Sequence, residues 1–401
     1  MGNSLKRATT IDTIRGFSLL GILMANMLIF QYGMFGKEKL HFFNASFLDL
    51  VGLDMLKIFV ESSFMPIFGF LFGYSLVKMK EGLNAKGLKF GRHIVRRSLL
   101  LILLGFLHLY FLWEGDVLLS YGAISFSLLM FVNRKPKTLA IWGCILLLVS
   151  GALSFGTAGS PSGEETQRID NFVRESITMY NNGSFGDIMQ FRSNANPFDL
   201  PDWFGFAMPL IAPLFIGAPF LFGMAAARSG MFMSPGREKK MYMRLALGLV
   251  PVGIFAKTAG ILLGENPPLS EVLSSLGGPI LALGYIFAFA LAYAHSSKHS
   301  IVVRSFEAVG RMSLTNYLMQ TVICVFIFYG YGLGLFGKLG VIPGILLALV
   351  IYAIQAALSF YILNKFRIGP IERLLRIGVY WSWSGRPKTK QPASKPEMTS
   401  A

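Results

Sequence analysis

The chain has 401 residues, of which 53% are hydrophobic and only 14% are charged, and its formal net charge at pH 7 is +16. Because soluble domains carry about 25% charged residues, this composition excludes a soluble globular protein. The basic residues lie in separate connections between apolar segments instead of in one patch, which argues against nucleic acid as a partner.

Ten apolar segments follow one another along the chain, and each comes close to the roughly 20 residues that a helix needs to span a bilayer. Uninterrupted apolar runs favour helices over the alternating strands of a membrane barrel. The third and fourth segments are short and adjacent, so we expect a tight hairpin there. The sequence predicts an all-α polytopic membrane protein with spans at 12–32, 55–77, 98–113, 116–133, 138–157, 204–226, 244–263, 273–294, 312–331 and 341–364.

The Lys and Arg residues are unevenly divided between the two sets of alternating connections. The set that includes the N-terminus holds 28 of them, whereas the opposite set holds 6. Since cytoplasmic loops of membrane proteins are enriched in Lys and Arg, this division predicts that both termini are cytoplasmic. We therefore expect a multi-pass plasma-membrane protein, whose basic side also attracts anionic lipid of the bilayer.

The spans divide the chain into four parts. Residues 1–157 hold the first five spans, and residues 204–365 hold the last five. Residues 158–203 are expected outside the cytoplasm, and the stretch ETQRIDNFVRESITMY predicts an amphipathic helix because its apolar residues recur at helical spacing. Residues 366–401 are expected to form a basic, largely disordered cytoplasmic tail.

Ionisable and amide side chains inside spans are costly and tend to mark functional positions. In the first span, Arg15 lies one turn after Asp12, and Asn26 lies further along roughly the same face. This pattern fits either a binding site or a helix-end ion pair with a snorkelling arginine. Glu61, four residues after Lys57 in the second span, fits either a binding site or simple charge pairing.

His108 lies in an apolar run, with Glu114 and Asp116 in the turn that follows and Tyr121 in the next helix. A carboxylate that orients a histidine is the usual way to build a general base. The alternative is a core histidine whose hydrogen bonds are satisfied inside the bundle. If the turn brings His108 and Asp116 together, we expect an acid–base site that is open to the outer face.

The segment GRMSLTNYLMQT opens the ninth span and places Asn316 and Gln320 on one helix face, with Tyr317 beside them. These groups could bind an anionic or acyl group at the helix N-terminus, or they could hold neighbouring helices together. We expect Arg15, Asn26 and Asn316 to line one water-accessible cavity formed by spans one to four and nine.

Other chemistry finds no support in the sequence. Cys144 and Cys324 are the only cysteines, each lies inside a predicted span, and the five histidines show no metal-ligand spacing. No metal site is therefore predicted. The sequence also has no Walker motif, so ATP is not expected to drive the protein.

Six segments occur in a characteristic order: IDTIRGFSLLGILMANM, FMPIFGFLFG, RRSLLLILLGFLHLYFLWEGDVLLSYG, YNNGSFGDIMQFR, VGRMSLTNYLMQT and FRIGPIERLLR. Together they resemble the YeiB-like family of bacterial membrane proteins, a group of unknown function, from about residue 8 to residue 380. Glu372–Arg373 depart from the acidic-then-aromatic pair expected at that place in the family.

The first four spans are also similar to those of transmembrane acyltransferases related to heparan-glucosaminide N-acetyltransferase. This resemblance implies transfer of an acyl group from cytoplasmic acyl-CoA to a hydroxyl or amine on the far side of the membrane. The acceptor would be a small molecule, a lipid or a glycan. Asn26 matches an active-site asparagine of that enzyme, and WEGDVLLSYG matches its turn between spans three and four.

On this hypothesis His108 removes the acceptor's proton, Asp116 orients His108, and Asn26 or Asn316 stabilises the developing oxyanion. The side chains expected to hold the CoA phosphates are Arg92, Arg96 and Arg97. Further substrate contacts are expected from Arg15, Glu61, Glu114, Tyr121, Asn316, Tyr317 and Gln320.

Two interpretations from other classes stay open beside the acyltransferase. One is a transporter or exporter of a small amphipathic molecule, and the other is a non-catalytic membrane scaffold. The sequence also leaves the oligomeric state open, a homodimer included.

Overall fold

The structure, a computed structural model, describes residues 9–157, 162–194, 196–198, 201, 203–264, 267–297 and 300–387. Within these ranges the regular structure is entirely helical, which confirms the predicted all-α class. In chain order the helices are α1 (Thr9–Gly36), η1 (Leu40–Phe43), α2 (Phe47–Phe59), α3 (Phe64–Asn84), α4 (Phe90–Phe111), α5 (Leu118–Leu129), α6 (Pro136–Thr157), α7 (Gly163–Asn182), α8 (Phe185–Asn194), α9 (Trp203–Ile216), α10 (Ala218–Arg228), α11 (Pro235–Leu262), α12 (Pro267–His295), α13 (Ile301–Arg311), α14 (Ser313–Phe328), α15 (Val341–Phe366) and α16 (Pro370–Tyr380).

Seven helical stretches in the described part of the chain are long and apolar enough to span a membrane. The pair α13–α14, bent by 85°, adds an eighth if it is counted as one span. The chain is thus a polytopic helical membrane protein with fewer full-length spans than the ten expected. The seven stretches are Thr9–Gly36, Phe47–Asn84, Phe90–Phe111, Pro136–Gly156, Pro235–Leu262, Pro268–His295 and Val341–Phe366.

The span expected at 116–133 is much shorter in the structure, where it is the 12-residue helix α5. The Asp116 carboxylate accepts a hydrogen bond from the backbone N–H of Leu119 at 2.8 Å, as a helix-capping residue does. This bond fixes the start of α5 and leaves the residues before it as a non-helical turn. The tight hairpin expected between α4 and α5 is present.

One other expected span is interrupted, and another is shorter than expected. The span expected at 204–226 divides into α9 and α10 just before Pro219, which lacks the N–H needed to continue a helix. The span expected at 312–331 is the continuous 16-residue helix α14, which begins at the bend after α13.

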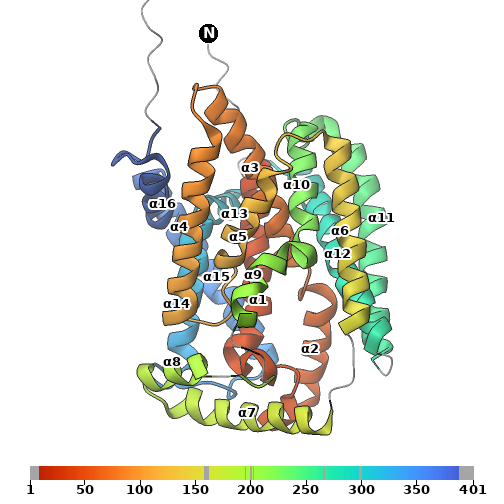
Figure 1. Ribbon diagram of the computed structural model, residues 1–401, viewed down its shortest axis with the longest axis vertical. Helices are drawn as coiled ribbons and strands as arrows, with labels where there is room; N and C mark the ends of the chain where they lie inside the picture. Colours follow the sequence, from red (N-terminus) through yellow and green to blue (C-terminus); the bar gives the residue numbers. More distant parts are fainter. Residues whose placement is uncertain are drawn as a thin grey trace, which may run out of the picture.

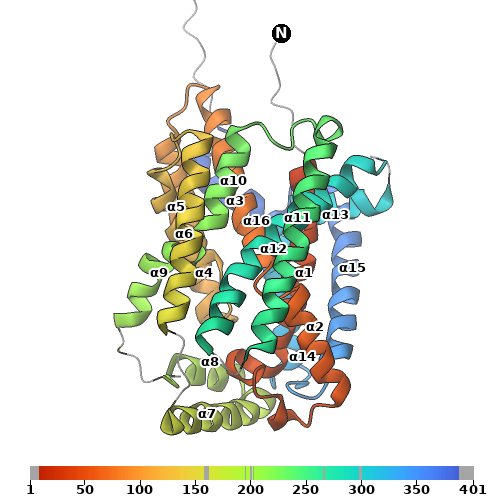
Figure 2. The ribbon, with the colours of Figure 1, turned by 90° about the vertical axis from the view of Figure 1, so that its right-hand side faces the viewer.

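Figures 1 and 2 show α1 running through the middle of the bundle, where it contacts α3, α13, α14 and α15. We call the end at which α1 begins the terminal end, and the opposite end, covered by α7 and α8, the loop end. The basic connections α3–α4 and α10–α11 lie at the terminal end. If the charge division predicts the orientation correctly, the terminal end faces the cytoplasm.

The amphipathic helix expected in 158–203 is present as α7, which lies across the loop end of the bundle (Figure 1). Its inner face buries Val173, Ser176 and Tyr180. An ion pair of 2.9 Å between Lys39 and Asp170 adds to this contact. The helix therefore closes the bundle at the end where the charge division places the outer face.

The C-terminal tail is more ordered than expected, because residues Pro370–Tyr380 form the helix α16. Ile371, Leu375 and Tyr380 pack against the core, and Val379 is buried. The tail was predicted to be largely disordered because its composition is polar and basic, but this short segment carries enough apolar side chains to dock on α4 and α14. Residues 388–401 lie outside the described residues.

Candidate functional site

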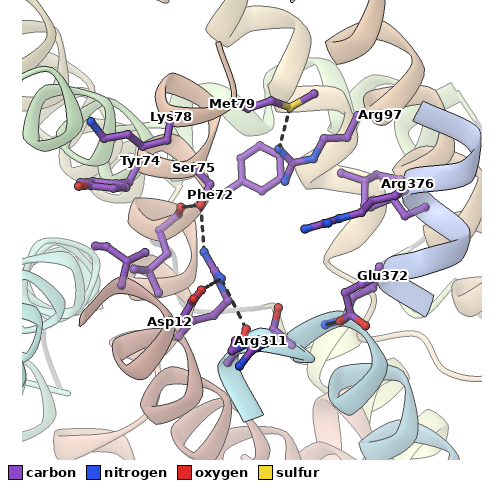
Figure 3. Close-up of a pocket in the computed structure, with 18 of the residues that line it drawn as sticks. Asp12, Phe72, Tyr74, Ser75, Lys78, Met79, Arg97, Arg311, Glu372 and Arg376 are labelled. Atoms are coloured by element: carbon purple, nitrogen blue, oxygen red, sulfur yellow. Dashed lines mark hydrogen bonds and ion pairs between the residues drawn. The ribbon is translucent and has the colours of Figure 1, made fainter. Parts of the chain in front are cut away.

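A cavity of about 670 Å³ lies inside the terminal half of the bundle, and we call it the central cavity. Its walls come from α1, α3, α4, α5, α13, α14 and α16, and Figure 3 shows part of them. The exposed residues Lys86, Arg367 and Arg376 lie at its mouth. Sites for cofactors and small ligands have volumes of about 300–1,000 Å³, so this cavity can hold one.

The lining of the central cavity is strongly basic. Seven cationic residues line it: Arg15, Lys78, Lys86, Arg97, Arg311, Arg367 and Arg376. Among its described lining residues the carboxylates are those of Asp12 and Glu372. Glu372 accepts hydrogen bonds from the backbone N–H groups of Leu314 and Thr315, at 2.8 and 3.0 Å, and so caps the N-terminus of α14. The excess of cations makes the cavity attractive to an anionic ligand.

Arg97 is the clearest uncompensated charge in the cavity. Its guanidinium lies 4.6 Å from the ring centroid of Phe72 and contacts Sδ of Met79 at 3.8 Å (Figure 3). Within the described residues no carboxylate pairs with it. A cation taken out of water usually needs an opposite charge, since burying it alone costs several kcal/mol. Arg97 therefore has donors left for an anion that enters the cavity.

Arg15 is held differently from Arg97. Its Nη1 donates to Oδ1 of Asp12 at 2.8 Å, and its Nη2 donates to Oγ of Ser75 at 2.9 Å. The ion pair expected from the sequence is formed, and both of its residues line the cavity, where Figure 3 labels Asp12. The paired guanidinium also lines the cavity, so a ligand contact by Arg15 stays a prediction that this geometry allows.

The inner part of the cavity is apolar. It is lined by Leu19, Ile22, Phe68, Leu71, Leu101 and Leu118. Tyr121 and Tyr317, both expected as substrate contacts, lie at its floor, and their hydroxyls donate to the carbonyl oxygens of Met65 (3.1 Å) and Gly115 (3.4 Å). A basic mouth and an apolar floor are the features of a site for an amphipathic anion.

A buried polar cluster lies behind this floor. Nδ1 of His108 is 2.8 Å from Oδ2 of Asp116, and Nε2 of His108 is 2.9 Å from Oγ1 of Thr321. The ring of His108 packs against Tyr317, with a centroid distance of 5.3 Å, and lies edge-on to Trp113. The turn after α4 thus brings His108 and Asp116 together.

The His108–Asp116 pair is not open to the outer face, which corrects that part of the sequence interpretation. Both side chains are only 1% exposed. Tyr317 and Trp113 cover the imidazole ring, and α7 and α8 cover the loop end of the bundle. The nearest large space is the central cavity, on the terminal side of Tyr317.

Of the three residues expected to line one cavity, only Arg15 does so. Asn316 is fully buried, and its Nδ2 donates to the backbone oxygen of Val309 (3.2 Å) and to Oγ of Ser359 (2.9 Å). Gln320 donates to Gln355 of α15 at 2.9 Å. Asn316 and Gln320 therefore hold α14 against α15, and the prediction of a ligand contact is wrong for both in this arrangement.

Asn26 lies one turn beyond the cavity-lining Ile22 and is 8% exposed. In the described part of the chain no group hydrogen-bonds to its side chain. An amide that is nearly buried and has no protein partner is unusual, because it loses water without gaining a hydrogen bond. The expectation that Asn26 lines the cavity is wrong, yet its amide stays available just beyond the floor.

Glu61 and Glu114 lie away from the central cavity. Glu61 pairs with Lys37, whereas Lys57 pairs with Glu38 at 2.5 Å, so the pairing of Lys57 with Glu61 expected from their spacing is replaced. The two pairs join α2 and the turn after it to the connection after α1, which is the charge-pairing role considered for Glu61.

Glu114 also has partners toward the loop end. Its carboxylate accepts from Oη of Tyr180 at 3.1 Å and lies 3.9 Å from Nε of Arg192. Burial raises the pKa of Glu114 above its ordinary value, although Arg192 acts in the opposite direction. The expected substrate contact of Glu114 is replaced by a contact that ties α7 and α8 to the turn after α4.

Of the three arginines expected to bind CoA, only Arg97 lines the cavity. Arg92 is exposed on α4, and the guanidinium of Arg96 stacks on Trp381 at 4.6 Å. All three lie on α4, but their positions around the helix differ, so only one points inward. Arg92 and Arg96 therefore do not line the central cavity, and a CoA contact by either stays an untested prediction.

Several residues of the site were not singled out from the sequence, among them Arg311, Arg367, Arg376 and Thr321. Arg367 and Arg376 occur in FRIGPIERLLRIG, a segment that already carried the family resemblance, and that signal could have been used. Thr321 also belongs to one of the family segments, VGRMSLTNYLMQT, but nothing there distinguishes it, because a threonine in an apolar helix most often bonds to its own backbone. Its contact with His108 depends on the approach of α4 to α14, which sequence spacing cannot predict.

The fold and the site together define a polytopic helical membrane protein with a basic, half-enclosed cavity. Residues 226–382 match a family described as "Protein of unknown function (DUF418)". The chain is 34% identical to the uncharacterized protein YxaH of Bacillus subtilis, covering 94% of this chain and 95% of that protein. It is 30% identical to the uncharacterized protein YeiB of Escherichia coli, covering 93% and 96%. No solved structure matches the chain significantly.

These similarities extend over nearly the whole chain, and the chain therefore belongs to the YeiB-like family of membrane proteins. Both relatives are described as uncharacterized. These relatives therefore give no support to the acyltransferase resemblance.

Proposed function

We propose that the chain binds acyl-CoA in the central cavity and transfers its acyl group to a hydroxyl or amine acceptor. The observation that carries the proposal is Arg97, whose guanidinium faces a ligand-sized cavity without a paired carboxylate among the described residues. A phosphate group would supply the missing negative charge, and the planar guanidinium can bind it through two parallel hydrogen bonds.

The two halves of the cavity match the two halves of such a ligand. Lys86, Arg97 and Arg376 on the side of the mouth would hold phosphates, and the apolar floor would hold the acyl end. A simple phosphate would gain nothing from the floor, and a fatty acid would leave most of the cations unused. An amphipathic anion with several phosphates uses both.

The membrane orientation agrees with this ligand. We place the protein in the bacterial plasma membrane with both termini in the cytoplasm, since the basic connections gather at the terminal end. The mouth of the cavity would then face the compartment in which acyl-CoA is made. The acceptor, which is a small molecule, a lipid or a glycan, would then have to reach the site past α7 and α8, which cover the loop end.

One observation favours export as the second candidate function. The described lining of the cavity includes no residue of α7 or α8, so the cavity is open at the terminal end and closed toward the loop end. A transporter that alternates between two open states has such a cavity in each of them. On this alternative the same amphipathic anion would be carried across without covalent change.

The test is acetyl-CoA binding to the purified full chain in detergent, measured by calorimetry. Arg97→Gln should weaken binding by about 10- to 100-fold, as expected for loss of a charged hydrogen bond in a largely enclosed site. Arg92→Gln is the matched control, because Arg92 lies on the same helix outside the cavity. Absence of binding by the wild type, or equal losses in both variants, would overturn the proposal.

A second measurement separates enzyme from exporter. Proteoliposomes that hold the wild-type chain are given labelled acetyl-CoA on the side of the terminal end. Transfer of the acetyl group to an added amine or hydroxyl compound supports the enzyme, whereas accumulation of intact acetyl-CoA in the lumen supports export.

A further inference from the structure

Thr321 completes a chain of three hydrogen-bonding groups that begins at Asp116. Oδ2 of Asp116 lies 2.8 Å from Nδ1 of His108, and Nε2 of His108 lies 2.9 Å from Oγ1 of Thr321. The three groups come from the α4–α5 turn, from α4 and from α14, so tertiary packing alone brings them together. The order carboxylate–imidazole–hydroxyl is the order found in enzymes with an activated hydroxyl nucleophile.

The hydrogen bonds determine which nitrogen of His108 carries the proton. A carboxylate can only accept, so Nδ1 of the neutral ring donates its hydrogen to Asp116. Nε2 then carries a lone pair, and the Thr321 hydroxyl donates to it. Asp116 is itself fixed, because its Oδ1 accepts from the backbone N–H of Leu119. The ring is thus oriented to take a proton from Thr321.

This arrangement changes the role expected for His108. The lone pair that would accept a proton from an acceptor molecule is already used by Thr321, and Thr321 is 1% exposed. In this arrangement no acceptor reaches Nε2 without displacing Thr321. The group in position to lose its proton to His108 is the threonine hydroxyl.

We propose that Thr321 is the nucleophile of the reaction and carries the acyl group between donor and acceptor. This inference rests on the proposed function, since acyl-CoA is the donor. In the first step Oγ1 of Thr321 attacks the thioester carbonyl, a C–O bond forms, and the hydroxyl proton passes to Nε2 of His108. The C–S bond then breaks, and the CoA thiolate leaves with the proton from His108.

In the second step the acceptor hydroxyl or amine attacks the acyl-threonine ester and gives its proton to His108. The C–O bond to Thr321 breaks, and Oγ1 takes the proton back. The sum is acyl-CoA plus acceptor giving acylated acceptor plus CoA. Asp116 stabilises the imidazolium that forms in both steps without taking its proton.

The position of Thr321 relative to the cavity fits this role. It follows the floor residue Tyr317 by four residues, about one helical turn, on the same face of α14. Tyr317 separates the cavity from Thr321: its hydroxyl donates to the Gly115 carbonyl at 3.4 Å and accepts from the backbone N–H of Val117, so this side chain has to rotate before a ligand in the cavity can reach Thr321.

Asn26 supplies the remaining group that the chemistry needs. It lies one turn beyond the floor residue Ile22 on α1, as Thr321 lies one turn beyond Tyr317 on α14. Its amide has no protein partner among the described residues. The oxyanion role predicted for either asparagine thus falls to Asn26, because the Nδ2 of Asn316 already donates to Val309 and Ser359.

The experiment incubates the purified full chain with acetyl-CoA and no acceptor, followed by denaturation, proteolysis and mass spectrometry of the α14 peptide. We expect one acetyl ester on Thr321 that hydroxylamine removes, since the buried site excludes water that would hydrolyse it. Thr321→Ser should keep the adduct. Thr321→Val, which keeps the shape, should lose it while binding acetyl-CoA as the wild type does.

Each outcome decides between the proposals. Binding of acetyl-CoA without any adduct, together with unchanged acetyl transfer by Thr321→Val, overturns the nucleophile and leaves the proposed function intact. Failure of the wild type to bind acetyl-CoA overturns both. If Thr321→Val does not fold, Thr321→Ser still decides, because an adduct in the wild type must move to the serine.

Discussion

Gly16 of α1 and Gly310 of α13 lie at a crossing where the two helix backbones touch. A Cβ atom on Gly16 would lie 1.9 Å from the carbonyl oxygen of Phe306, and one on Gly310 would lie 1.8 Å from the carbonyl oxygen of Asp12. Small residues allow such close approach of membrane helices. Since Arg15 belongs to the same turn of α1, this crossing also sets the position of one wall of the central cavity.

The first prediction concerns this crossing. Gly310→Ala should destabilise the protein by roughly 1–3 kcal/mol or more, because the added methyl group overlaps backbone atoms that cannot rotate away. Gly248→Ala in α11 is the control, since no atom lies within 4 Å of its Cβ position, and it should leave stability unchanged or higher. Thermal unfolding of both variants in one detergent checks this. If Gly310→Ala and Gly248→Ala had equal melting temperatures, the close approach of α1 and α13 at Gly310 would be contradicted.

The second prediction separates structural amides from functional ones. Asn316→Ala should lower stability by about 1–3 kcal/mol, because Ser359 and the carbonyl oxygen of Val309 lose their buried partner. Acetyl-CoA affinity of the folded fraction should not change, since Asn316 does not line the cavity. Thermal unfolding and calorimetry on one preparation measure both quantities. If Asn316→Ala lost affinity for acetyl-CoA while its thermal stability stayed unchanged, Asn316 would be a ligand-binding residue and not a structural one.

Much of the fold could be predicted from the sequence, because a bilayer imposes length and polarity on every span. The predicted spans are longer than the observed helices where an apolar run continues but local chemistry ends the helix, as at Asp116 and Pro219. Helix α16 was missed because the composition of the whole tail is polar and basic, although this short segment carries enough apolar side chains to dock on α4 and α14.

The site was harder to predict than the fold. His108 and Asp116 were found because they are eight residues apart and the short turn between them leaves few arrangements. Thr321 is 213 residues from His108, and nothing in local spacing relates the two. Likewise Arg92, Arg96 and Arg97 are alike in sequence, and only the neighbours of α4 decide that Arg97 faces the cavity.

The third prediction uses Glu372, which caps α14 at the edge of the cavity. Glu372→Gln removes one of the cavity's negative charges but keeps an oxygen that can accept from Leu314 and Thr315. Acetyl-CoA should therefore bind a few-fold more tightly at low salt, and the difference should fade as salt screens the cavity charge. Calorimetry at two ionic strengths measures this. If Glu372→Gln bound acetyl-CoA more weakly than the wild type at both ionic strengths, the helix cap that Glu372 forms on α14, and not its negative charge, would determine the affinity.

The fourth prediction tests the orientation of the molecule in the membrane. Gly186 and Gly236 are both exposed and both lie in the first turn of a helix, but Gly186 belongs to α8 at the loop end and Gly236 to α11 at the terminal end. Neither Cβ position has an atom closer than 3.8 Å, so a cysteine fits at each without strain. The two positions form a matched pair for labelling from opposite sides of the membrane.

The natural cysteines Cys144 and Cys324 are first replaced by serine and alanine, respectively, because Cys144 is exposed and Cys324 is buried. If the charge division fixes orientation, a membrane-impermeant maleimide should label Gly186→Cys on intact cells and should label Gly236→Cys only after lysis. The reverse pattern would place the central cavity at the outer face. Cytoplasmic acyl-CoA could then not enter it, and the proposed function would fail along with the orientation.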